Sequence, residues 1–162
     1  MIGTALIALA AAAPGLGDGF AQFSRSPALR KERVEVAVGV LGTDRASGKT
    51  LYWARRVVTD RSGPVTTFAD SNTCPSIHHV LDGLAKLEVP TPQVPGLNQP
   101  DEFKIIMDGT GYRLTASTQY AGQLGQVTFG SNIDTPLAAW IDDSLARLQG
   151  CWTHLPPERP AP

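Results

Sequence analysis

The chain contains an internal repeat, which limits the folds it can adopt more than any other feature. Residues 66–87 align without a gap on residues 127–148, at an offset of 61 positions. Seven of the 22 aligned pairs are identical, where ordinary residue usage would supply about one or two. A long repeat that occurs only twice indicates a duplicated unit of strands and helices rather than a solenoid. The identical pairs are Thr67 and Thr128, Phe68 and Phe129, Pro75 and Pro136, Asp82 and Asp143, Leu84 and Leu145, Ala85 and Ala146, and Leu87 and Leu148.

Each copy of the repeat ends in a predicted helix. In the first copy Pro75 suits the first helical turn, where its missing N–H group costs nothing, and apolar residues follow at helical spacing. In the second copy Thr135 is a predicted N-cap before Pro136, and Gly150 is a predicted stop. The two apolar stripes consist of Ile77, Val80, Leu81, Leu84 and Leu87, and of Leu137, Ile141, Leu145 and Leu148.

Strand patterns precede both helices. Apolar and polar residues alternate along several short segments that are separated by turns rich in Gly, Asp and Ser, which is typical of half-buried strands. The predicted strands of the first copy are 34–41, 50–58 and 65–69, and those of the second are 103–107, 112–120 and 126–130. Each copy is therefore predicted to be a three-stranded meander followed by a helix.

The predicted fold class is α+β, a tandem duplication of a β-β-β-α unit. About six antiparallel strands form one sheet, and two antiparallel helices bury their stripes on one face of it. Residues 34–154 make a single domain that consists of repeat A (34–88), a proline-rich linker (89–101) and repeat B (102–150).

The two ends of the chain lie outside this domain. Residues 1–13 are apolar, too short to span a bilayer, and end in small residues, as in a signal peptide that is cleaved near Ala12 or Ala13. The segment 14–33 contains Gly, Ser and Pro and is predicted to be a flexible lead-in. The tail 155–162 has four prolines and little to bury, and is predicted to be disordered. We therefore expect a periplasmic or secreted protein with no membrane span in the mature chain.

The chain has two cysteines, Cys74 and Cys151. An even number in an exported protein indicates a disulfide. Cys74 lies at the start of the first predicted helix and Cys151 just past the end of the second. These positions come together when the two helices run antiparallel, so we predict a Cys74–Cys151 bond.

The charge of the chain is small in total and uneven along its length. The net charge of −1 gives no reason to expect nucleic acid as a partner. Residues 25–61 carry nine basic and four acidic residues, and residues 62–162 carry five basic and ten acidic ones. This imbalance fits two halves that attract each other on folding, and it also fits a polar binding surface.

Candidate catalytic and metal-binding residues are few. His78 and His79 are adjacent on the first predicted helix, with Asp82 four residues after His78. Two groups at this spacing can begin a zinc site, but such sites normally use three or four protein ligands. The chain has no nucleophile elbow and no complete phosphate loop. We therefore predict no catalytic residue, no metal site and no cofactor.

The sheet face opposite the helices is the predicted binding surface. Along residues 112–120, Arg113, Thr115, Ser117 and Gln119 alternate with apolar residues and point to that face. Arg55 and Arg56 on the second strand are the other predicted ligand-binding residues. An antiparallel sheet often has one wet face without any function, which is the simpler interpretation of this pattern.

These observations favour an exported, non-catalytic binding or accessory protein. Its ligand is a protein or a polysaccharide on the open sheet face, and the chain is a monomer or a weak dimer. The alternative hypothesis is a small periplasmic hydrolase or metal-dependent enzyme centred on His78. A deep cleft or a metal site at His78 would favour the enzyme, and a shallow polar sheet face favours the binding protein.

Overall fold

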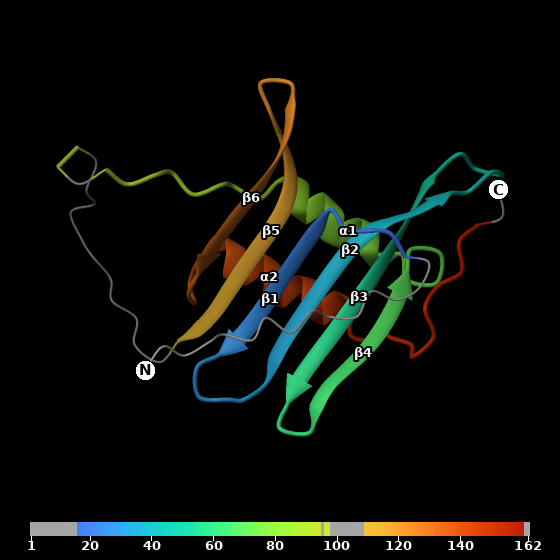
Figure 1. Cartoon of the computed structure of the whole chain (residues 1–162), viewed down its shortest axis with the longest axis horizontal. Coiled ribbons are helices and arrows are strands. Elements are labelled where there is room, and N and C mark those ends of the chain that lie inside the picture. The colour runs from blue at the N-terminus through green and yellow to red at the C-terminus, as the bar shows by residue number, and fades with distance from the viewer. Residues whose placement is uncertain (1–15, 95, 98–108, 161–162) are drawn as a thin grey trace, which may run out of the picture.

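Six strands form one antiparallel sheet in the computed structural model, which describes residues 16–94, 96–97 and 109–160 (Figure 1). The strands are β1 (Ala21–Pro27), β2 (Arg33–Thr43), β3 (Thr50–Asp60), β4 (Gly63–Asp70), β5 (Thr110–Tyr120) and β6 (Gln123–Ser131). Their spatial order is β4-β3-β2-β1-β5-β6. The predicted α+β class with a single antiparallel sheet is thus confirmed.

Both helices lie on one face of the sheet (Figure 1). They are α1 (Ser76–Ala85) and α2 (Pro136–Arg147). The Thr135 hydroxyl accepts a hydrogen bond from the Ala138 N–H at 3.1 Å, so the predicted N-cap is present. Ile77 and Val80 of α1 and Ile141 of α2 are buried against the sheet. The apolar stripes therefore supply the core, as their spacing predicts.

The helices run antiparallel and are joined by the predicted disulfide. Cys74 and Cys151 are bonded, with their Cα atoms 5.6 Å apart. Near the middle of both helices the Trp140 indole N–H donates to the Val80 carbonyl at 3.2 Å. The disulfide joins the residue before the start of α1 to a residue after the end of α2, and the Trp140–Val80 bond joins the two helices near their middles. The two helices therefore run in opposite directions.

The described residues do not confirm the tandem duplication of a β-β-β-α unit. Strands β2, β3 and β4 precede α1 as predicted for repeat A, with one additional strand before them. Between α1 and α2 two strands are described, and the third one predicted there, 103–107, lies outside the described residues. The additional strand is β1, which lies in the segment 14–33 that the composition predicts to be a flexible lead-in. It pairs with β2 on one side and with β5 on the other. Ala21 and Phe23 are almost completely buried there, and this burial fixes a segment whose composition indicates a loop.

The offset of 61 residues still relates the remaining elements. Shifted by 61, β3 (50–60) falls on 111–121, where β5 spans 110–120, and β4 (63–70) falls on 124–131, where β6 spans 123–131. Helix α1 (76–85) falls on 137–146, inside α2. The strand order shows the same correspondence: β2 lies beside β3, and β1 lies beside β5. A common origin of the two halves stays a prediction.

Some predicted segments lie outside the described residues. They are the signal peptide, residues 1–13, and the strand predicted at 103–107. The tail predicted to be disordered is described as far as Pro160 and forms no helix or strand between residues 155 and 160. Just before it, Thr153 forms a β-bridge with Phe68 on β4, with N–H to carbonyl distances of 2.8 Å in both directions.

A second, smaller apolar cluster lies on the helix-free face. It consists of Ala37, Leu41, Leu51 and Trp53, with Leu16 packed on it. The Trp53 ring lies directly over Gly39, because a Cβ atom there would come within 2.4 Å of the indole carbons Cε2 and Cζ2. At this cluster the helix-free face of β2 and β3 is therefore apolar and buried. The open polar surface lies on the side of β1, β5 and β6.

The disulfide should contribute strongly to stability. It encloses a sequence separation of 77 residues, which corresponds to about 4.5 kcal/mol of loop entropy. We expect Cys151→Ala to lower the free energy of unfolding by about 2–5 kcal/mol in urea titrations. Cys74→Ala combined with Cys151→Ala should cost a similar amount, because both variants lack the same bond. Alkylation of two thiols in denatured, unreduced wild-type protein would contradict the bond.

The close contact between Gly39 and Trp53 gives a second stability prediction. Gly39→Ala should destabilise the protein by about 1–3 kcal/mol, because the new methyl group must displace a ring whose residue is only 2% exposed. Gly150→Ala is the control, since a Cβ atom at that position would meet no heavy atom within 4 Å and the φ of Gly150 is not positive. Equal unfolding midpoints for both variants would disprove the Trp53 contact.

Candidate functional site

The predicted polar row lies on the helix-free face of the sheet. Arg113, Thr115, Ser117 and Gln119 alternate along β5 with Tyr112 and Leu114, which are buried on the helix side. Cross-strand neighbours extend the row into a polar surface: Gln22 and Ser24 on β1, and Gln126 and Thr128 on β6. The Thr115 and Thr128 hydroxyls are hydrogen-bonded at 2.9 Å. The structure thus brings together the four predicted residues of β5.

Arg113 stands in a hollow at one end of this surface. Its cross-strand neighbours are Ser24 on β1 and Gly130 on β6. Gly111 and Gly130 have no side chains, and their positions line a depression of about 660 Å³ together with Ser26, Arg33 and Asn132. The hollow therefore combines two guanidinium groups with hydroxyl and amide groups.

The two arginines of the hollow differ in their partners. Arg33 pairs with Glu35 at 2.9 Å. Arg113 is exposed, and within the described ranges it has no ion-pair partner. A guanidinium with five donors and no carboxylate is suited to an external acceptor. Arg113 is the residue of this face with the strongest chemical case for binding.

The two predicted arginines of β3 separate onto opposite faces. Arg55 lies on the helix-free face, opposite Phe68 of β4. It is three strand positions from β5, about 14 Å at the usual strand spacing. Arg56 lies on the helix side, where its guanidinium stacks over the Trp152 ring at 4.7 Å and donates to Thr67 at 3.1 Å. Adjacent strand residues point to opposite faces of a sheet. The prediction that Arg56 belongs to the binding surface on the helix-free face is therefore wrong.

A polar cluster on the helix side was not predicted. The Tyr112 hydroxyl donates to the Asp142 carboxylate at 2.8 Å, and Arg25 lies 3.5 Å from the same carboxylate. These contacts connect α2 to β5 and β1, and the Arg25–Asp142 pair joins the basic and acidic halves of the chain. Burial, together with the hydrogen bond and charge of Asp142, raises the pKa of Tyr112 above its ordinary value of 10.0. The cluster anchors the helix and keeps the phenol protonated.

An apolar groove of about 380 Å³ lies on the helix side between the end of α1 and the sheet. Its lining comes from four elements, from Phe20 and from two residues after α1, Leu87 and Val89, which explains why no single sequence segment indicated it. The apolar lining includes Phe20, Tyr52, Leu81, Leu84, Leu87, Leu114, Val127 and Phe129.

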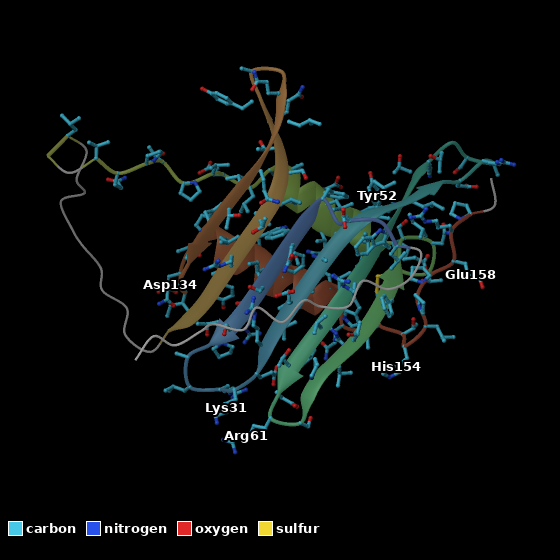
Figure 2. All side chains as sticks on the ribbon, viewed as in Figure 1. Lys31, Tyr52, Arg61, Asp134, His154 and Glu158 are labelled. Carbon is cyan, nitrogen blue, oxygen red and sulfur yellow. A yellow bond between two sulfur atoms is a disulfide. The ribbon has the colours of Figure 1, made fainter. Side chains whose placement is uncertain are left out.

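The surroundings of His78 bear on the enzyme hypothesis. His78 is exposed, and its ring meets Tyr52 edge-on with centroids 5.6 Å apart. Tyr52, labelled in Figure 2, lines the apolar groove, whereas His78 is outside the set of lining residues. In the described part of the chain no three His, Cys, Asp or Glu side chains are grouped as a metal site requires. The contact that the structure gives the His78 side chain is thus an aromatic one.

Comparison with known proteins finds no protein family, no curated protein and no solved structure that this chain matches. Neither helix of the described residues has the length and apolar character that a membrane crossing needs.

The Tyr112 cluster predicts a pH dependence of stability. Because the pKa of Tyr112 is raised in the folded state, its contribution is complete below pH 10 and is lost as the pH rises through the folded value. The free energy of unfolding of wild type should fall more steeply above pH 10 than that of Tyr112→Phe. Tyr120→Phe, at a position that is 84% exposed, is the control and should follow wild type. Identical pH profiles for wild type and Tyr112→Phe would contradict the shift.

Proposed function

We propose that this protein is an exported, non-catalytic binding protein that holds its ligand on the polar sheet surface around Arg113. One observation carries the proposal: Arg113 is exposed in a polar hollow and has no carboxylate partner among the described residues. A structural arginine at this position would be expected to pair with an acid or to lie on a ring, as Arg33 and Arg56 do.

The chemistry of the hollow indicates the class of ligand. A guanidinium binds carboxylates through two parallel hydrogen bonds, and the surrounding Ser24, Ser26 and Asn132 can bond hydroxyl or amide groups. A ligand that presents an acidic group among polar groups fits this surface. Both an acidic protein loop and an acidic polysaccharide have that character.

Two features support the export that the proposal includes. Residues 1–13 have the pattern of a signal peptide. The chain also has a disulfide between Cys74 and Cys151, and such bonds persist mainly in oxidising compartments outside the cytoplasm. Intact-mass measurement of the protein from an exporting bacterium tests the cleavage near Ala12 or Ala13.

Arg113→Ala should abolish capture of the ligand while the melting temperature stays nearly the same. The side chain is exposed, and surface substitutions usually change stability by no more than about 0.5 kcal/mol. The measurement is retention of material from a native envelope fraction, and of acidic and neutral polysaccharides, on immobilised protein. Arg45→Ala is the matched control, because Arg45 is also an exposed arginine but lies in the turn between β2 and β3.

The outcomes separate binding from structure. Retention by wild type and Arg45→Ala, with loss in Arg113→Ala, supports the proposal. Equal retention by all three proteins removes the Arg113 surface as the site. A large fall in the melting temperature of Arg113→Ala would show that the residue has a structural role.

A further inference from the structure

The two outer edges of the sheet differ in their protection. On the outer side of β4, Phe68 exchanges two backbone hydrogen bonds with Thr153, and Pro64 lies near the start of the strand. On the outer side of β6 the described residues place no strand. An unpaired edge presents a row of N–H and C=O groups that can pair with another strand. Among the described residues the open edge of the sheet is therefore β6.

Strand β6 lacks the features by which proteins usually block an edge. Its nine residues include no charged residue and no proline, and its pairing with β5 continues without a register shift. The whole segment 114–133 is uncharged. The β5–β6 hairpin extends beyond the rest of the sheet (Figure 1), and it exposes Tyr120 to 84% and Leu124 to 92%. Such an edge is prone to pairing.

We propose that β6 is a dimerisation edge, at which two copies of this chain pair antiparallel about a two-fold axis through Val127. In this register residue 124 of one copy faces residue 130 of the other, 125 faces 129, and 127 faces itself. Leu124 then lies opposite Gly130, and Gly125 lies opposite Phe129. Both glycines of β6 thus face a large apolar side chain of the other copy, and the pair of Phe129 with Gly125 is of the kind in which an aromatic ring compensates for a strand glycine.

The neighbouring registers lack this complementarity. A shift of the axis by one residue toward Thr128 places Gly125 opposite Ser131 and Gly130 opposite Gln126. A shift by one residue toward Gln126 places Gly125 opposite Val127 and leaves Gly130 beyond the paired segment. The pairing through Val127 keeps both sheet faces continuous, as the two shifted registers also do, with Val127 and Phe129 half-buried on the helix side in each copy. A second copy is therefore the occupant that this strand fits.

The absence of charge favours a second copy for another reason. In a two-fold antiparallel pair a charge close to the axis would lie beside the same charge of the other copy and oppose pairing. Strand β6 has no charge that could do so. The proposal does not rest on a ligand at Arg113, although Gly130, which would face Leu124 of the second copy, also lines the Arg113 hollow.

Light scattering during size-exclusion chromatography over a dilution series tests the dimer. Wild type should dissociate from dimer to monomer on dilution, and Leu124→Lys should raise the dissociation constant at least tenfold. Leu124 is almost fully exposed in the single chain, so this change leaves the monomer fold intact. Leu155→Lys is the control, at a tail position that is 79% exposed, and should dimerise like wild type.

A single cysteine tests the register. The two Val127 positions would lie within the Cα separation of a disulfide, and the native cysteines are bonded to each other. Mild oxidation of Val127→Cys should therefore give a covalent dimer. Ser117→Cys, an exposed position on β5, should not, because two copies of β5 would lie about 14 Å apart.

Several results would overturn the proposal. Wild type that stays monomeric up to about millimolar concentration has no dimerisation edge. A dimer that is insensitive to Leu124→Lys, with no cross-link at Val127→Cys, uses another surface. Hydrogen exchange in dilute monomer gives a further test. If the β6 amides that point away from β5 were as protected in the monomer as in the dimer, the chain itself would cover this edge. Oligomers that grow beyond a dimer would exclude the two-fold arrangement.

Discussion

The central strand β1 is the element on which the rest of the structure depends. It pairs with β2 through Ala21 and Val38 and with β5 through Ala21 and Ala116, and it alone joins the two parts of the described sheet. Phe23 is only 1% exposed and packs edge-on against Trp140 of α2, with ring centroids 4.9 Å apart. The strand pairing between β1 and β5 spans most of the chain, so it is a non-local contact with a high entropy cost. Pairing at both edges of β1 and the burial of Phe23 offset that cost. The polar surface at Arg113 exists because this strand brings Ser24 beside β5.

Elements with strong local signals could be predicted from the sequence. The helices were located by their apolar spacing and by Thr135 before Pro136, and both signals act within a few residues. The strands were located by alternation, and the direction of the Arg113 row follows from the same period of two. The internal repeat added long-range information, because it indicated antiparallel helices and hence the bond between Cys74 and Cys151. Elements whose structure is determined by residues close in the sequence could therefore be predicted from the sequence alone.

Features that depend on distant partners were missed. The segment of β1 contains two serines and a proline after Gly-rich residues, so its composition favours a loop, and its pairing with both β2 and β5 makes it a strand. Arg55 and Arg56 are adjacent, and the sequence did not fix which of them shares the face of Arg113. Trp152, which covers Arg56, lies far along the chain in a segment without helix or strand. The apolar groove has the same origin, since its lining comes from elements that are separate in sequence.

The position of the disulfide has a consequence for resistance to proteases. The exposed residues 88–94 after α1 form no helix or strand, and such segments are the usual sites of proteolytic cleavage. The Cys74–Cys151 bond encloses this segment together with both helices, β5 and β6. A single cut there leaves the two fragments covalently connected, and the strand pairing between β1 and β5 remains intramolecular. Wherever the disulfide stays oxidised, a nicked chain would therefore keep its sheet and its polar surface.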